Sequence, residues 1–300
     1  MKRINKFREK VQYMESFSKK ISDMSEEEIE NMSKKINCTL TKEYKEHKIF
    51  SELEKYSDFY NSLGFSTFSW FTMGVKGIIN FDNYIFSSMK GTLESIKLIL
   101  EHGKINDAFS LTRKYYDNVV INIYALLYLE DNHSLNNFIV EKINNWVTNK
   151  EKLPDYKVMN SYIRNSRQLK TINNLMFRGE YYKKMRIRLN DHTHYNYFKY
   201  MFYNDNEMAD FGNNRTKFLE QLSIDIKNIF ILHFIWLFTI KDNYMMASDH
   251  IDYLDMGETP PKNSEYWVAP FIQTIFDEVI KKNRPDLVEE FKKSTCMEIK

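Results

Sequence analysis

Apolar residues recur at helical spacing along most of this chain, separated by charged and polar positions. In the first stretch the apolar positions stand among lysines and glutamates, and they are Phe7, Val11, Met14, Phe17 and Ile21. This pattern predicts a helical arm over residues 1–62. Two interpretations of its apolar face stay open, packing on its own chain or on a second copy, because the heptad pattern is too short to indicate a coiled coil.

The next part of the chain begins with a stretch that lacks helical spacing. Residues 63–80 contain several Phe, Trp and Gly positions, and we expect them to connect the arm to a core. Helices are predicted over residues 84–100 and 108–129. The first should end at Gly103, because glycine is favoured just past a helix terminus, and Asn106 should cap the second.

Two runs are apolar around the whole helix and should be buried. The predicted helix over residues 108–129 loses its polar positions after Asp117, and residues 229–240 form the second run. At about 12 residues the second run is shorter than the roughly 20 residues that cross a bilayer. A buried core helix is therefore favoured over a membrane span, and His233 within it is expected to be a hydrogen-bonded core histidine.

The sequence suggests three parts in all. After the arm, we expect residues 63–256 to form a core domain and residues 257–300 to add C-terminal helices packed on it. A break that includes Pro260 separates the two, and a helix is predicted over residues 266–282. Pro285 should open a short last helix, because proline is favoured in the first helical turn.

Composition supports an all-α helical bundle and excludes several classes of protein. The chain has only 8 Gly and 5 Pro, far below the roughly 12% of average usage, so the tight turns of a many-stranded fold are disfavoured. With 43% hydrophobic and 15% aromatic residues, the chain is not intrinsically disordered. No secretory signal is recognisable, and Cys38 and Cys296 are too few for a disulfide framework, so a cytoplasmic location is expected.

Positive charge is concentrated between residues 164 and 188, although the whole chain carries a net charge of only +2. This segment holds a single acid, Glu180, and the basic residues Arg164, Arg167, Lys170, Arg178, Lys183, Lys184, Arg186 and Arg188. Aromatic residues, among them Tyr195 and Tyr197, follow at once. Cations that neutralise phosphate beside rings that stack on bases are typical of single-stranded RNA binding. A solvated basic face beside core aromatics is the alternative interpretation.

The end of this segment brings together residue types suited to phosphodiester chemistry. Residues 185–196 include Arg188, His192 and His194. A guanidinium can bind phosphate and stabilise added negative charge, while an imidazole transfers protons near neutral pH. With RNA the nucleophile is the substrate's own 2′-hydroxyl, so such a site needs no metal ion and no cofactor.

Arg188 and His194, with five residues between them, match the R-x4-6-H signature of the HEPN superfamily. A second segment of the chain also resembles that superfamily. Residues 103–117 look like the first core helix of HEPN-like bacterial families, which carry an A-x-x-L-x-R-x-x-x-[ED] pattern there. The matching residues are Ala108, Leu111, Arg113 and Asp117. The two resemblances together cover residues 85–200.

The resemblance implies a helical bundle that pairs as a homodimer, with the motifs of two subunits facing one another across a cleft. Arg188 would grip the phosphate and His194 would act as acid or base in a metal-independent endoribonuclease. Supporting positions would be Asn190, His192, Arg113 and Asp117. RNA would contact Arg178, Lys183, Lys184, Arg186, Tyr195 and Tyr197. Many members of the superfamily serve in toxin–antitoxin, abortive-infection and antiviral defence systems, so an antitoxin or regulatory protein would be a further partner.

Two features leave a different role open. Leu189 stands where active members usually carry a polar residue, and the net charge of the whole chain is only +2. The register of the motif is also ambiguous, because Arg186 and His192 have the same spacing as Arg188 and His194. A non-catalytic HEPN-like module that binds RNA or protein is therefore the alternative.

Other charged positions are interpreted as structural. Arg113 and Asp117 lie four apart on one helix face, which favours an ion pair that fixes packing over a second phosphate ligand. Asp191 could orient His192 or cap a helix, and capping is favoured. The acids of residues 249–258 favour a solvated face over a magnesium site, because no glycine-shaped ligand loop accompanies them.

Overall fold

The computed structural model describes residues 23–27, 40–77, 80–204 and 214–300. Within these ranges the chain forms helices, and its extended segments make isolated bridges but no strand. The predicted all-α fold is confirmed. Most of the predicted arm, including its apolar positions from Phe7 to Ile21, lies outside the described residues.

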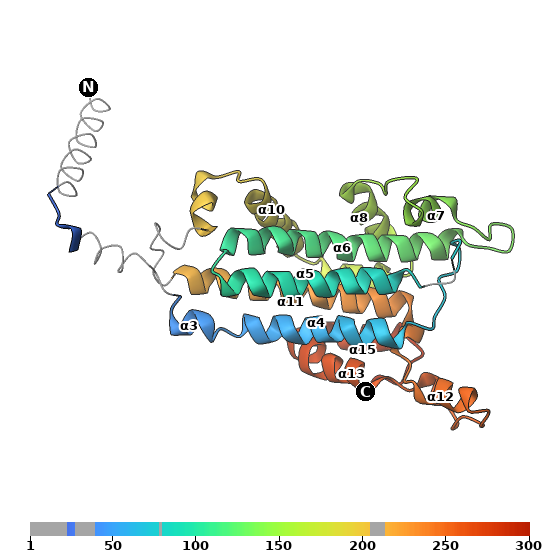
Figure 1. Ribbon diagram of the computed structural model, residues 1–300. Coiled ribbons are helices and arrows are strands. Elements are labelled where there is room, and N and C mark those ends of the chain that lie inside the picture. The colour runs from blue at the N-terminus through green and yellow to red at the C-terminus, as the bar shows by residue number, and fades with distance from the viewer. Residues whose placement is uncertain (1–22, 28–39, 78–79, 205–213) are drawn as a thin grey trace.

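Long helices form the body of the molecule and run side by side in Figure 1. They are α4 (Ile49–Ser66), α5 (Asp82–Glu101), α6 (Ile105–Asn132) and α11 (Asn214–Ile240). Helix α5 contacts α4 and α6, and α11 also contacts both. The four elements therefore close around one shared core.

Shorter helices cover this bundle. Along the chain they are α3 (Lys42–Lys45), α7 (Glu141–Val147), α8 (Tyr156–Asn165), α9 (Lys170–Met176), α10 (Tyr181–Thr193), η1 (Phe198–Asn204), η2 (Asp242–Met245), α12 (Asp249–Asp255), η3 (Ser264–Tyr266), α13 (Pro270–Ile275), the π-helical segment η4 (Phe276–Ile280), α14 (Lys281–Asn283) and α15 (Pro285–Lys293). Helices α7, α8 and α10 pack along α6, while α13 packs on α4 on the other side of the bundle in Figure 1.

Helix α11 is buried around its whole circumference from Ile229 to Phe238. It is the one helix in the described part of the chain that is long and apolar enough to cross a membrane, but 83% of its apolar window lies inside the bundle. The apolar run thus faces protein on all sides, as predicted for a core helix.

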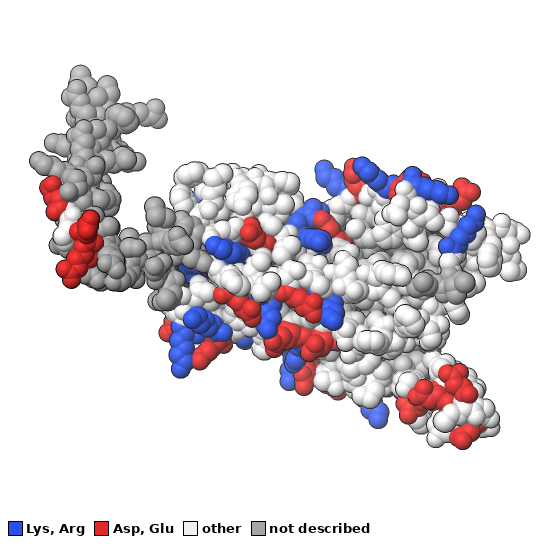
Figure 2. Space-filling model, in the orientation of Figure 1, with Lys and Arg blue, Asp and Glu red and all other residues white. Residues whose placement is uncertain are grey.

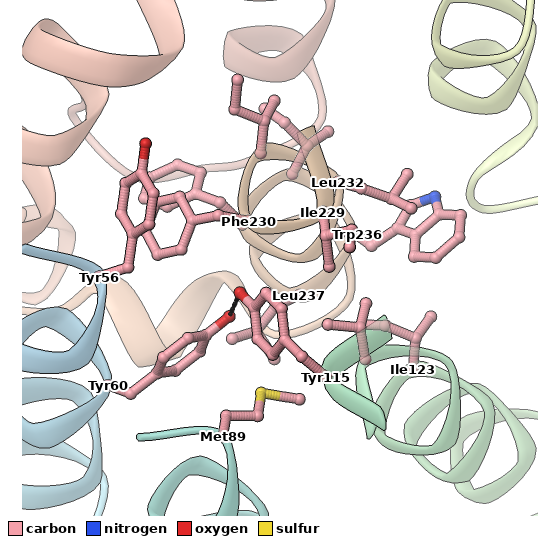
Figure 3. Packing of buried hydrophobic residues seen from close by; sticks show 14 of the residues in the cluster. Tyr56, Tyr60, Met89, Tyr115, Ile123, Ile229, Phe230, Leu232, Trp236 and Leu237 are labelled. Carbon is pink, nitrogen blue, oxygen red and sulfur yellow. Dashed lines mark hydrogen bonds between the residues drawn. The ribbon is translucent and has the colours of Figure 1, made fainter. Parts of the chain in front are cut away.

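Aromatic rings fill the space between α4 and α11. Tyr56 stacks on Phe230 with the ring centroids 4.2 Å apart (Figure 3). Phe59 meets the ring of Phe230 edge-on, with the centroids 5.1 Å apart. The hydroxyl groups of Tyr60 and Tyr115 lie 2.8 Å apart beside them, as the dashed line in Figure 3 shows. Edge-on and stacked ring pairs of this kind stabilise a core beyond the area they bury.

His233 satisfies both of its ring nitrogens inside this core. Nδ1 lies 2.9 Å from the Tyr60 hydroxyl and Nε2 lies 2.8 Å from Oδ1 of Asn122. Burial lowers the pKa of His233 to about 3, so the ring is neutral near pH 7. The predicted hydrogen-bonded core histidine is confirmed.

Most of the predicted helix boundaries agree with the structure. The helices expected over residues 84–100 and 108–129 are α5 and α6, and Gly103 ends α5 in the left-handed conformation with φ of 71°. Helix α15 opens at Pro285 as expected. The helix expected over residues 266–282 begins only at Pro270, because η3 and an extended stretch precede it.

Two expectations about helix ends are corrected. Helix α4 continues across the division expected after residue 62, and its side chains, Leu63 among them, belong to the shared core. Helix α6 begins at Ile105, so Asn106 lies in its first turn and is not its N-cap. The Asn106 side chain is buried and hydrogen-bonds His192 of α10 through both its amide atoms, so it joins two helices.

Replacing Phe230 with alanine should lower the free energy of unfolding by about 3–5 kcal/mol, because it leaves a cavity among the rings of Tyr56 and Phe59. Urea unfolding followed by circular dichroism measures this loss. Phe65→Ala is the matched control, since Phe65 is 77% exposed and its removal should change stability by about 0.5 kcal/mol or less. Similar losses for the two variants would contradict the assignment of the core.

Candidate functional site

Helix α10 carries most of the residues that the sequence singled out. It is amphipathic, with Tyr182, Met185, Leu189 and His192 buried at spacings of three and four residues. This face packs on α6, while the rest of the circumference carries the charged positions. Leu189, the departure from the HEPN pattern, is therefore a core residue.

Arg188 reaches sideways to Asp225 of α11. Its Nη2 lies 2.6 and 2.9 Å from the two carboxylate oxygens, and its Nε lies 3.2 Å from Oδ2. Tyr181 and Gln221 also donate to Asp225 Oδ1, at 2.7 and 3.0 Å. Burial raises the pKa of Asp225, and the guanidinium of Arg188 opposes that rise. The sequence analysis did not identify Asp225 as a site residue. The one feature that could have indicated it is that Asp225 is an acid just before the apolar run of α11.

His194 is the C-cap residue of α10 and is exposed. Its backbone N–H donates to the Asn190 carbonyl at 3.0 Å. Six residues of helix turn through about 600° and rise about 9 Å, which leaves the two side chains about 120° apart, so Arg188 and His194 lie on different faces of α10. One subunit alone therefore does not bring the predicted catalytic pair together.

His192, in contrast, is a core residue. Its ring stacks on Phe109 with centroids 3.9 Å apart and lies 4.1 Å from the ring of Tyr200. Nδ1 lies 2.9 Å from Oδ1 of Asn106. Burial lowers the pKa of His192 to about 3, and the positive charges of Arg188 and Lys199 add to this effect. A neutral ring fixed in this way stabilises the joint between α6 and α10 and is a poor proton carrier near pH 7.

The supporting residues on α6 and α10 form a second cluster. Asp117 pairs with Arg113 on its own helix, as the spacing predicted, and it also accepts from Nη1 of Arg186 at 2.5 Å. Arg113 donates from Nε to Oδ1 of Asn190 at 2.7 Å. The guanidinium of Arg186 lies 3.1 Å from the centre of the Tyr156 ring. Burial and the charge of Arg186 lower the pKa of Arg113 to about 10. The two arginines share one carboxylate, so the cluster keeps one positive charge.

The predicted RNA-binding residues divide into exposed and enclosed positions. Arg178, Lys183, Lys184, Tyr195 and Tyr197 are exposed, whereas the Arg186 side chain is only 11% exposed. Lys183 and Lys184 lie 3.2 and 3.9 Å from the carboxylate of Glu180, which partly neutralises this face. Asp191 is at the C-terminal end of α10, where it accepts from Asn196 and closes the turn.

Apolar side chains are exposed around the end of α10 and on η1. We name this the η1 apolar surface, and its members are Tyr195, Tyr197, Phe198, Met201 and Phe202, with exposures of 39–71%. Figure 2 shows few charged side chains over the part of the molecule where η1 lies. An exposed apolar surface of this kind usually marks an interface. In the sequence, His194 directly precedes Tyr195 of this surface.

The acids of residues 249–258 cover α12, which forms a separate acidic projection in Figure 2. Asp249, Asp252 and Asp255 are exposed there. No cluster of three or more His, Cys, Asp or Glu side chains suited to a metal ion occurs in residues 23–27, 40–77, 80–204 and 214–300. The predicted solvated acidic face is the arrangement seen.

Comparison of this chain with protein-family models, with curated protein sequences and with solved structures finds no match. The HEPN resemblance therefore depends on the quoted motif residues alone.

The buried, neutral state of His192 should make the stability of the protein sensitive to acid. The unfolded chain takes up a proton at this residue below its ordinary pKa of 6.5, whereas the folded chain does so only near pH 3. The stability contributed by the neutral ring is complete above pH 6.5 and falls by about 1.4 kcal/mol per pH unit below it. We expect the stability advantage of the wild type over His192→Asn, measured by urea unfolding, to shrink by about 2 kcal/mol between pH 7.5 and 5. An advantage that stays constant with pH would contradict this.

Proposed function

We propose that this chain is a HEPN-like endoribonuclease that cleaves RNA at the α10–η1 end of the bundle without a metal ion. The observation that carries the proposal is the place of His194, an exposed imidazole at the end of α10 directly before the exposed rings of Tyr195 and Tyr197. Exposed rings suit base stacking, and an accessible imidazole suits proton transfer near neutral pH.

The proposed reaction uses the nucleophile that RNA supplies. His194 accepts the proton of a 2′-hydroxyl, whose oxygen attacks the adjacent phosphorus, and the bond to the 5′-oxygen of the next nucleotide breaks. The imidazole of His194, protonated by that step, then gives its proton to the leaving 5′-oxygen and returns to its starting state. The products are a 2′,3′-cyclic phosphate and a 5′-hydroxyl, and the reaction consumes neither water nor a cofactor.

Arg188 is the proposed phosphate ligand. Its Nε and Nη2 are occupied by Asp225, while Nη1 makes no hydrogen bond within the described residues and the side chain is 28% exposed. A fixed guanidinium can place its remaining N–H groups with little loss of entropy. Because Arg188 and His194 lie on different faces of α10, the proposal includes a homodimer in which the pair is completed across the subunit interface.

The alternative is a non-catalytic HEPN-like module that binds RNA or protein. One observation favours it, the pairing of Arg188 with the buried carboxylate of Asp225, which Tyr181 and Gln221 also hold by hydrogen bonds, because this is the arrangement of a structural ion pair. In this alternative the η1 apolar surface binds a partner, and an antitoxin or regulatory protein is the kind of partner that the resemblance implies.

Cleavage of RNA in EDTA tests the proposal directly. We expect wild-type protein to cut single-stranded RNA and leave 2′,3′-cyclic phosphate ends, and His194→Ala to lower the rate by about 10²–10⁴-fold. His102→Ala is the matched control, because His102 is also exposed at a helix C-cap and should keep wild-type activity. Wild-type protein that binds RNA but leaves it intact would favour the non-catalytic module, and an active His194→Ala variant would contradict the site.

The homodimer is tested through the η1 apolar surface. Phe198 is 71% exposed, so Phe198→Ser should leave the fold of one subunit intact but weaken dimerisation by about 30-fold, measured by sedimentation velocity. Phe65→Ser removes an equally exposed ring elsewhere on the bundle and should leave dimerisation unchanged. A monomeric wild type would contradict the dimer.

A further inference from the structure

A cavity of about 320 Å³ opens at the end of the bundle where α5 begins and α6 and α11 end. Its walls come from separate parts of the chain, namely residues 70–73, the first residue of α5, the last turns of α6 and residues 241–244. Its volume lies in the range of small-molecule sites. Arg113 and Glu130 on α6 are 17 residues apart, which corresponds to about 25 Å of helix, so this cavity is far from the α10 cluster.

Asp82 is one of the polar residues that line the cavity. Its side chain is completely buried, and its carboxylate accepts from Nδ2 of Asn122 at 2.7 Å and from the Tyr244 hydroxyl at 2.9 Å. Neither partner is charged, and Asp82 forms no ion pair within the described ranges. Burial raises the pKa of Asp82 to about 6, so the carboxylate is mostly ionised at pH 7. The positive charge of Lys241 opposes this rise, but that ammonium is already paired with Glu130. A buried carboxylate without an ion-pair partner of its own is costly, and a bound cation would relieve that cost.

His133 provides a second, independent sign of a ligand. Its Nε2 is buried and has no hydrogen-bond partner, although the ring lines the cavity. Orphaned buried nitrogens are rare in folded proteins, and a bound molecule is an ordinary explanation. The remaining charged groups of the wall, Lys241 and Glu130, pair with each other, so Asp82 leaves the cavity with one net negative charge.

Aromatic side chains form part of the cavity wall, and the backbone of residues 70–77 that carries two of them is held against α6. Trp70 and Tyr244 lie with ring centroids 6.3 Å apart, and Phe71 also lines the cavity. Gly74 holds the 70–77 stretch against α6, because it has φ of 91° and a Cβ there would lie 2.9 Å from Cδ2 of Leu129. Its carbonyl also accepts from the backbone N–H of Val140 at 2.8 Å. Aromatic faces around a negative charge attract organic cations.

We propose that this cavity binds a small organic cation, with a planar amidinium or guanidinium group or a primary ammonium group on Asp82 and an apolar part against Trp70 and Phe71. The cation donates to the carboxylate oxygens of Asp82, supplies its missing countercharge and lies within reach of Nε2 of His133. The site is independent of RNA cleavage, since no residue of α10 or η1 lines it.

Isothermal titration calorimetry with benzamidine, methylguanidinium and phenethylammonium tests the site, with benzamide as the neutral analogue of benzamidine. We expect at least one of the cations to bind and to raise the melting temperature, and benzamide not to bind. Asp82→Asn keeps the shape and one accepting oxygen for its two hydrogen-bond donors but removes the charge, so the affinity should fall by about tenfold or more. Trp70→Leu, at the partly exposed wall, should also weaken binding while leaving the polar network intact.

Asp131→Asn is the matched control. It removes one carboxylate next to Glu130 in the sequence, but Asp131 is exposed and does not line the cavity, so cation affinity should stay at the wild-type value. The proposal is overturned if none of the three cations binds, if benzamide binds as well as benzamidine, or if folded Asp82→Asn protein retains full affinity.

Discussion

The structure depends on burying a helix that is apolar on every side and still contains a histidine. Helix α11 can bring His233 into the core only if both ring nitrogens find partners, and these come from Tyr60 of α4 and Asn122 of α6. Asn122 in turn donates to Asp82 at the start of α5. One chain of hydrogen bonds therefore connects the long helices and sets their register, because an unsatisfied polar group in this core would cost about 1–3 kcal/mol.

The same demand for buried partners explains how α10 is held. Apolar packing fixes one face of the helix, and the arginines on either side are tied down by single carboxylates, Asp225 for Arg188 and Asp117 for Arg186. These contacts give α10 a defined rotation on the bundle. They also occupy part of the hydrogen-bonding capacity of the guanidinium groups, so any phosphate bound here must share an arginine with a structural carboxylate.

Local pattern was enough to predict the helical fold, the burial of residues 229–240 and the pair of Arg113 with Asp117, because each depends on spacing within one helix. The partners across helices could not be predicted in this way. Asp225 lies 37 residues after Arg188, and nothing in the spacing of the motif indicates that the two side chains meet. For the same reason His192 and His194 look equivalent in sequence, yet one is stacked on Phe109 and the other is exposed.

The two ends of the bundle carry different chemistry for a physical reason. At the α10–η1 end, buried charges are paired within the chain, and the exposed surface is apolar and aromatic. At the opposite end, the hydrogen-bonded chain that starts at His233 reaches Asp82, which lines the cavity. The carboxylate of Asp82 forms no ion pair with any side chain in the described ranges, so the cavity carries its negative charge. A molecule that balances this charge would stabilise the polar chain through the core, so occupancy of the cavity and stability of the bundle should be linked.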